Sequence, residues 1–87
     1  LRPFGTIKSQ KDNSPLPLAV VRIFNEKNNF LLATKVSDSQ GRFNFLLAPG
    51  RYYLTCSKSG FAQHKSEGIL IEKSGLVSMD VRLAESY

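Results

Sequence analysis

The chain of 87 residues is long enough for one hydrophobic core but not for two, because domains usually hold about 100–150 residues. Its 41% hydrophobic and 22% charged residues are typical of a soluble globular domain, which excludes disorder and a fibrous repeat. The net charge of +5 comes from Lys and Arg residues that are scattered along the chain, so nucleic acid is not a predicted partner.

Three further features of the sequence bear on domain organisation, membrane spanning and cellular compartment. We interpret residues 1–87 as a single domain excised from a larger protein, because the chain starts at Leu1 rather than Met. No apolar run exceeds four residues, whereas a membrane-spanning helix needs about 20, so the domain is not predicted to cross a bilayer itself. Cys56 has no second cysteine to pair with, so cysteine usage does not reveal whether the compartment is oxidising.

Short segments in which every second residue is apolar, separated by turn residues at intervals of about eight to twelve positions, predict an all-β sandwich or barrel. Residues 4–8 form the first strand, with Ile7 directed inward, and residues 9–14 form a polar loop. The second strand has Pro15 and Pro17 at its start, where their missing N–H groups predict that the entry lies at an edge or outside the hydrogen-bonded ladder. Its buried face is predicted to consist of Leu16, Ala19, Val21 and Ile23.

The third strand is predicted over residues 30–37. The turn before it, residues 26–29, consists of poor strand formers and ends in two asparagines, which tolerate the positive φ of a tight turn. The tetrapeptide Asp38-Ser39-Gln40-Gly41 forms the next turn, in which Asp38 bonds the backbone and Gly41 takes a positive φ.

The fourth and fifth strands are predicted over residues 42–47 and 51–58, on either side of a turn at Pro49-Gly50. Proline fixes φ at the first position of such a turn, and the glycine that follows accepts a positive φ. Alternation assigns five residues of these two strands to the buried core: Phe43, Phe45, Tyr52, Leu54 and Cys56.

The last two strands are predicted over residues 68–72 and 76–83, separated by Lys73-Ser74-Gly75. Before them, Phe61 folds back over the edge of the sandwich and residues 62–67 form a polar crossing loop. The inward residues of the last two strands are predicted to be Ile69, Ile71, Val77, Met79, Val81 and Leu83.

Together these elements predict a seven-stranded antiparallel β-sandwich. The connections are short and no helical period is present, so the helical crossovers that join parallel strands are missing. Two layers packed face to face bury one side of every strand. Residues 84–87, after the last strand, are expected to fray or to lead into a following domain.

No set of residues points to catalysis, to a cofactor or to a metal. The only histidine, His64, and Cys56 could form a Cys–His pair, but alternation places Cys56 in the core, where an apolar setting raises the pKa of a thiol. One His and one Cys cannot supply the three or four ligands of zinc, and Asp38 is a lone carboxylate where calcium needs several oxygens. We therefore predict no catalytic, cofactor-binding or metal-binding residues and no enzyme activity.

The turn and core residues also follow a recognisable order: Gly5-x-Ile7, Pro15-Leu16 with Ala19-x-Val21, Ser37-Asp38-x-x-Gly41-Arg42-Phe43-x-Phe45, Pro49-Gly50-x-Tyr52-x-Leu54, Gly60-Phe61 and Met79-Asp80-x-x-Leu83. Over nearly the whole chain this order resembles the carboxypeptidase regulatory-like domain. The resemblance implies a transthyretin-like, Greek-key sandwich without catalytic residues. It also implies an extracytoplasmic location, secreted or in the cell envelope, because such domains are often found beside peptidase catalytic domains, in bacterial envelope proteins and ahead of outer-membrane receptor barrels.

We therefore predict a non-catalytic structural or interaction module, whose partners are neighbouring domains of the same chain or another protein. Its partner surface is predicted at Phe24, Phe30 and Tyr53, which fall on the outward phase or at loop positions. The alternative is a carbohydrate-binding module that stacks sugar rings on these aromatics, although the absence of Trp favours packing against a protein. The same residues could form a homodimer edge, so the oligomeric state stays open.

Overall fold

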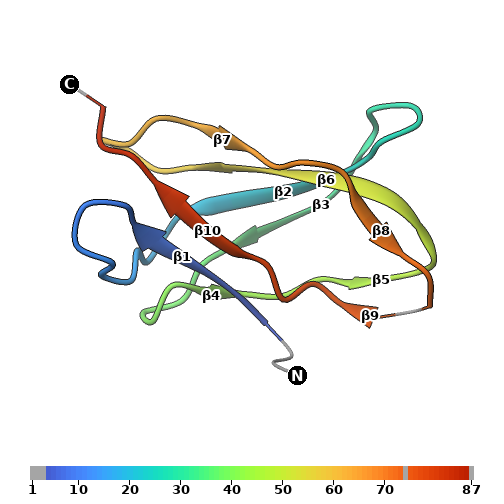
Figure 1. Cartoon of the computed structure of the whole chain (residues 1–87), viewed down its shortest axis with the longest axis horizontal. Helices are drawn as coiled ribbons and strands as arrows, with labels where there is room; N and C mark the ends of the chain where they lie inside the picture. The colour runs from blue at the N-terminus through green and yellow to red at the C-terminus, as the bar shows by residue number, and fades with distance from the viewer. Residues whose placement is uncertain (1–3, 74, 87) are drawn as a thin grey trace.

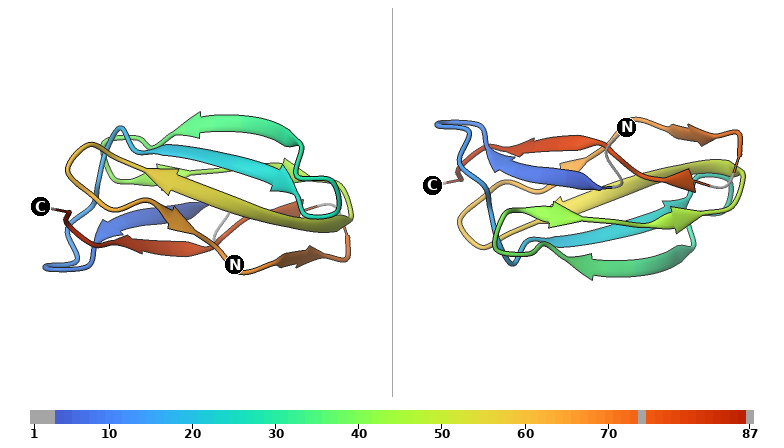
Figure 2. Two further views of the ribbon diagram at one scale, coloured as in Figure 1. Left: turned by 90° about the horizontal axis from the view of Figure 1, so that it is seen from above. Right: turned by 90° about the horizontal axis from the view of Figure 1, so that it is seen from below.

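The computed structural model of the chain describes residues 4–73 and 75–86, and within them it contains strands but no helix. Two layers of strands face each other across a hydrophobic core (Figure 1, Figure 2). Ser74, in the predicted turn, and Tyr87, in the predicted C-terminal tail, lie outside the described residues. The predicted all-β, sandwich-like class is confirmed.

The larger layer is a five-stranded antiparallel sheet made of β2 (Val20–Asn25), β3 (Leu31–Val36), β6 (Gly50–Ser57), β7 (His64–Lys65) and β8 (Ile69–Ile71). β6 lies in the middle, paired with β2 along one edge and with β7 and β8 in line along the other. β3 pairs only with β2, so it forms the outer edge of this sheet.

The facing layer holds a three-stranded sheet in the order β10-β1-β4 and a two-stranded sheet, β5-β9. Its strands are β1 (Gly5–Ser9), β4 (Arg42–Phe43), β5 (Leu46–Leu47), β9 (Gly75–Leu76) and β10 (Asp80–Leu83). β1 lies between β4 and β10. Past the amino-terminal end of β1 no strand separates the two flanking segments, so β5, which follows β4, pairs directly with β9, which precedes β10.

The core lies between the two layers and follows the predicted alternation. Every residue predicted to face inward is buried, except Ile69, Ile71 and Met79, which are half-buried against the core. Phe43 and Phe45 pack edge to face, with their ring centroids 6.0 Å apart. Phe61 is also half-buried, and it forms an isolated bridge with Glu85 that ties the end of the chain to the larger layer.

The strand assignment differs from the seven predicted strands, since ten short strands are assigned among the described residues. The predicted strand at 42–47 is split into β4 and β5, because its first part pairs with β1 and its second part with β9. The predicted strand at 76–83 is split into β9 and β10 for the same reason. The predicted polar loop at 62–67 contains β7, which pairs with β6.

The expectation that every strand pair is antiparallel is wrong for one pair. β1 and β10 are parallel, with Thr6 opposite Asp80, Ile7 opposite Val81 and Ser9 opposite Leu83. A parallel pair needs a long connection between its two strands. Here the connection is the rest of the domain, because β1 and β10 are the first and last strands, and no helical crossover is required.

Candidate functional site

The side of the five-stranded sheet that faces away from the core, called the outer face below, holds two of the three predicted partner residues. Phe24 of β2 lies directly opposite Tyr53 of β6. Their rings stack with centroids 5.0 Å apart and planes only 10° from parallel. Both side chains are half-buried, which reflects this mutual packing.

Tyr53 is also held from its other side. The Lys65 ammonium of β7 lies 4.6 Å from the centre of the Tyr53 ring, and the Tyr53 hydroxyl donates a hydrogen bond of 2.9 Å to Asn29 Oδ1. Because β2 and β7 flank β6 on opposite sides, Phe24 and Lys65 cover opposite faces of the ring. The stacking surface that a sugar ring would need at Tyr53 is therefore occupied by the protein itself.

Phe30 stands apart from this pair, at the end of the turn before β3, with 66% of its surface exposed. Its backbone N–H donates to Asn28 Oδ1 at 3.0 Å, and its carbonyl accepts from the Asn25 N–H at 2.9 Å. The turn therefore fixes the Phe30 backbone and leaves the ring in solvent.

Three apolar side chains of β3 extend the outer face and were not among the predicted partner residues. Leu31, Leu32 and Val36 are 51%, 49% and 53% exposed. A β-bulge opposite Ile23 and Phe24 inserts Leu32 as an extra residue, so Leu31 and Leu32 both face outward. The signal in the sequence was the apolar run Leu31-Leu32-Ala33, which breaks the alternation that a half-buried strand should show.

The charged residues at the outward strand positions of the five-stranded sheet are all positive. Arg22 of β2 and Arg51 of β6 are outward because they alternate with the inward residues of these strands. Lys65 of β7 is outward because it pairs with an outward residue of β6. None of the outward strand positions of the five-stranded sheet, all of which lie in the described part of the chain, holds Asp or Glu. The outer face therefore combines exposed apolar side chains with an excess of positive charge, which only Glu26, beside Arg51 in the turn after β2, partly offsets.

The structure brings Cys56 and His64 to directly opposite positions in the pairing of β6 with β7. Cys56 is completely buried, and this burial raises the pKa of its thiol to about 11. At neutral pH the sulfur therefore stays protonated and out of contact with solvent, which is the opposite of what a nucleophilic cysteine requires.

Ser37 and Ser66, two of the three buried serines of the described chain, were not predicted to be buried, and both have structural partners. Ser37 Oγ donates to the Leu16 carbonyl at 2.7 Å and accepts from the Ala19 N–H at 2.9 Å. Ser66 Oγ accepts from the Leu54 N–H at 2.9 Å and donates to the Glu67 carbonyl at 2.9 Å. Both side chains satisfy backbone groups in the core, so neither is available for chemistry.

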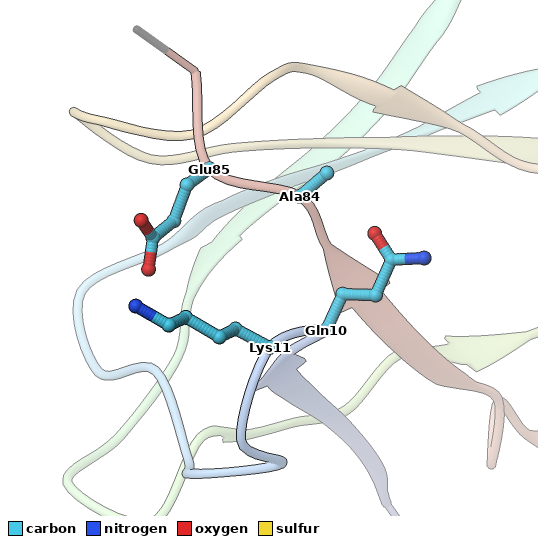
Figure 3. A pocket seen from close by; sticks show the side chains of 4 residues that line it. All are labelled: Gln10, Lys11, Ala84 and Glu85. Atoms are coloured by element: carbon cyan, nitrogen blue, oxygen red, sulfur yellow. The ribbon is translucent and has the colours of Figure 1, made fainter.

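One surface depression lacks the lining that is usual in small-molecule sites. A depression of about 300 Å³ is lined by Gln10, Lys11, Ala84 and Glu85, all of them exposed (Figure 3). Its volume is at the lower limit for small-molecule sites, which are usually lined by apolar and aromatic side chains. Among residues 4–73 and 75–86, no three His, Cys, Asp or Glu side chains are grouped as metal ligands would be, and no helix could span a membrane.

Two comparisons with known proteins complete these observations. The family model of the carboxypeptidase regulatory-like domain matches residues 4–84, which is nearly the whole chain. The search of curated proteins found no match.

Proposed function

The chain belongs to the carboxypeptidase regulatory-like domain family, and from this premise we propose that it is an accessory module that contacts a neighbouring domain in a larger extracytoplasmic protein. Domains of this family are typically non-catalytic. The protonated, buried thiol of Cys56 and the fully bonded Ser37 and Ser66 side chains agree with a module that performs no chemistry of its own.

The observation that supports this role best is the exposed apolar surface of β3. Leu31, Leu32 and Val36 each leave about half of their surface in water, beside the stacked Phe24 and Tyr53 rings. Exposed apolar surface of this kind marks contact sites in soluble proteins. The outer face therefore fits a protein partner that covers β3 and β2.

The charges of the outer face indicate the chemistry of this partner. Arg22, Arg51 and Lys65 outnumber the carboxylates near them, because no outward strand position of the five-stranded sheet holds Asp or Glu and only Glu26, in the turn after β2, lies beside Arg51. A second copy of the same face would bring like charges together, which opposes a symmetric dimer. The partner surface is instead apolar with Asp or Glu residues at its rim.

A glycan partner is supported less well. Phe24 and Lys65 already cover the two faces of the Tyr53 ring, and Phe30 lies at a separate turn. The aromatic platform that sugar stacking requires is thus incomplete.

The proposal can be tested by thiol labelling of the isolated domain and of the longer protein that contains it. We expect a maleimide to label Leu32→Cys rapidly in the isolated domain and at least about tenfold more slowly in the longer protein, because the partner domain excludes the reagent. The native Cys56 is buried and gives little background.

Leu46→Cys is the matched control, since Leu46 is 74% exposed but lies on the opposite layer. Its labelling rate is expected to stay the same in both forms. Equal rates for Leu32→Cys in the two forms would contradict the proposed contact surface. The extracytoplasmic location is tested separately, by labelling Leu46→Cys in intact cells with a membrane-impermeant maleimide.

A further inference from the structure

The parallel pairing of β1 with β10 determines how the domain responds to tension along the chain. β1 begins and β10 ends at opposite ends of their shared ladder (Figure 1). A force that pulls on the two chain ends therefore draws the two strands past each other, along their length. If the first and last strands were antiparallel neighbours, the same force would separate them one residue pair at a time.

We propose that the β1–β10 ladder is a shear clamp that allows the domain to carry tension between the segments on either side of it. In shear, the hydrogen bonds of the ladder share the load and must break together. These bonds include one from the Thr6 N–H to the Met79 carbonyl at 3.2 Å and one from the Gln10 N–H to the Leu83 carbonyl at 2.9 Å. Four residue pairs lie between these two ends of the ladder.

The side chains around the ladder strengthen the clamp. Ile7, Val81 and Leu83 are completely or almost completely buried, so water has little access to replace the backbone hydrogen bonds as they stretch. The Thr6 hydroxyl donates a hydrogen bond of 2.6 Å to Asp80 Oδ1 across the ladder. A charge-assisted bond of this kind is among the stronger ones in proteins.

β1 is also held along its other edge, so it cannot slide on β10 alone. Gly5 and Thr6 pair with β4, and the Ile7 N–H donates to the Gly41 carbonyl at 2.7 Å. The Ile7 carbonyl accepts from the Leu16 N–H at 2.9 Å. Extraction of β1 must therefore break hydrogen bonds on both of its edges in the same step.

The inference rests on the proposed function only in so far as neighbouring segments must exist to transmit the force. It is tested on the isolated domain by single-molecule pulling in two directions. In the shear direction, the handles are attached to the amino terminus and to Glu85→Cys. In the peeling direction, they are attached to Lys11→Cys and Glu85→Cys, two positions at the same end of the ladder whose side chains point toward each other (Figure 3).

We expect the unfolding force in the shear direction to be about twofold higher or more at the same loading rate, because several ladder bonds yield together rather than singly. Thr6→Val removes the bond to Asp80 and keeps the shape of the side chain. It is expected to lower the shear force and to leave the peeling force unchanged, since peeling starts at the other end of the ladder. Equal forces in the two directions would overturn the proposal.

The pulling experiment and the thiol-labelling experiment test the clamp and the contact surface independently. Force that depends on direction, together with unchanged labelling of Leu32→Cys in the longer protein, would leave the clamp standing and remove the docking role. Protection of Leu32→Cys together with equal forces would do the reverse.

Discussion

Cys56 links the stability of the domain to alkaline pH. Burial raises the pKa of its thiol from the ordinary value of 9.0 to about 11. Between these values the thiol ionises in the unfolded chain but not in the folded one, so the contribution of Cys56 to the free energy of unfolding is constant below about pH 9 and falls up to about pH 11.

We expect this decrease to reach about 2–3 kcal/mol, and urea unfolding between pH 8 and 11 measures it. Cys56→Val fills the same space with a group that does not ionise, so its unfolding free energy should fall less over that range. If the wild-type protein and the variant lost stability in parallel, the pH dependence would come from other groups.

Gly41 joins the turn at residues 38–41 to the core. Its φ is +76°, and an added Cβ would meet the Ile7 carbonyl oxygen and approach the Leu16 nitrogen to 3.2 Å. Both neighbours are backbone atoms that cannot move aside. The predicted role of Asp38 is also confirmed, because its Oδ1 accepts from the Gln40 and Arg42 N–H groups, each at 2.9 Å.

Gly60 provides a matched control for Gly41, because its φ is +88° but no atom lies within 4 Å of an added Cβ. We expect Gly60→Ala to cost about 1 kcal/mol from backbone strain alone, and Gly41→Ala about 2–4 kcal/mol, because a steric clash is added. Thermal or urea unfolding of the two variants measures the difference. Equal losses would mean that the Ile7 region adapts to the new methyl group.

Residue by residue, the inward positions could be predicted because the period of a strand assigns every second side chain to the core. The buried Ser37 and Ser66 could not, because serine is usually exposed and its burial depends on which backbone groups tertiary packing leaves without partners. The stacking of Phe24 on Tyr53 could not be predicted either. Their outward direction was predictable, whereas their stacking depends on the register of β2 against β6.

Among the elements, β3 combines an exposed apolar surface with an open edge. It carries two features that hinder edge-to-edge pairing with a strand of another molecule. One is the bulge at Leu32. The other is Lys35, which lies opposite the buried Val21 and therefore on the inward side of the edge, although its side chain is exposed. A second strand added there would have to bury this ammonium group without a partner.

We expect Lys35→Val to promote self-association through β3, because the variant replaces this charge by a strand-forming apolar residue. Sedimentation velocity at increasing concentration measures the effect. Lys27→Val is the matched control, with the same change at an exposed turn position away from the edge. A monomeric Lys35→Val variant would show that the bulge alone protects the edge.

The boundaries of the elements were only partly predictable. The turns at residues 26–29 and 38–41 could be located because Asn, Asp and Gly have local conformational preferences. The breaks between β4 and β5 and between β9 and β10 could not, because they occur where a strand changes its partner. A partner change depends on residues far away in the sequence and leaves no local signal.

For the whole molecule, composition and pattern were sufficient for the all-β, sandwich-like class, and the family match covers residues 4–84. The pairing of the first strand with the last in parallel was not predictable in the same way. Thr6 and Asp80 are 74 positions apart, and neither strand carries a local feature that selects its partner or its direction. The sequence predicted only part of the candidate surface. The apolar area of β3 was missed, because its exposure follows from the position of β3 at the edge of the sheet.

The distance between β1 and β10 along the chain also has a consequence for biosynthesis. Ribosomes add about 5–20 residues per second, so about 4–15 s pass between the synthesis of Thr6 and that of Asp80. During this interval Ile7 and its strand have been made but their parallel partner has not. The nascent domain therefore cannot complete its smaller layer until Leu83 has left the exit tunnel.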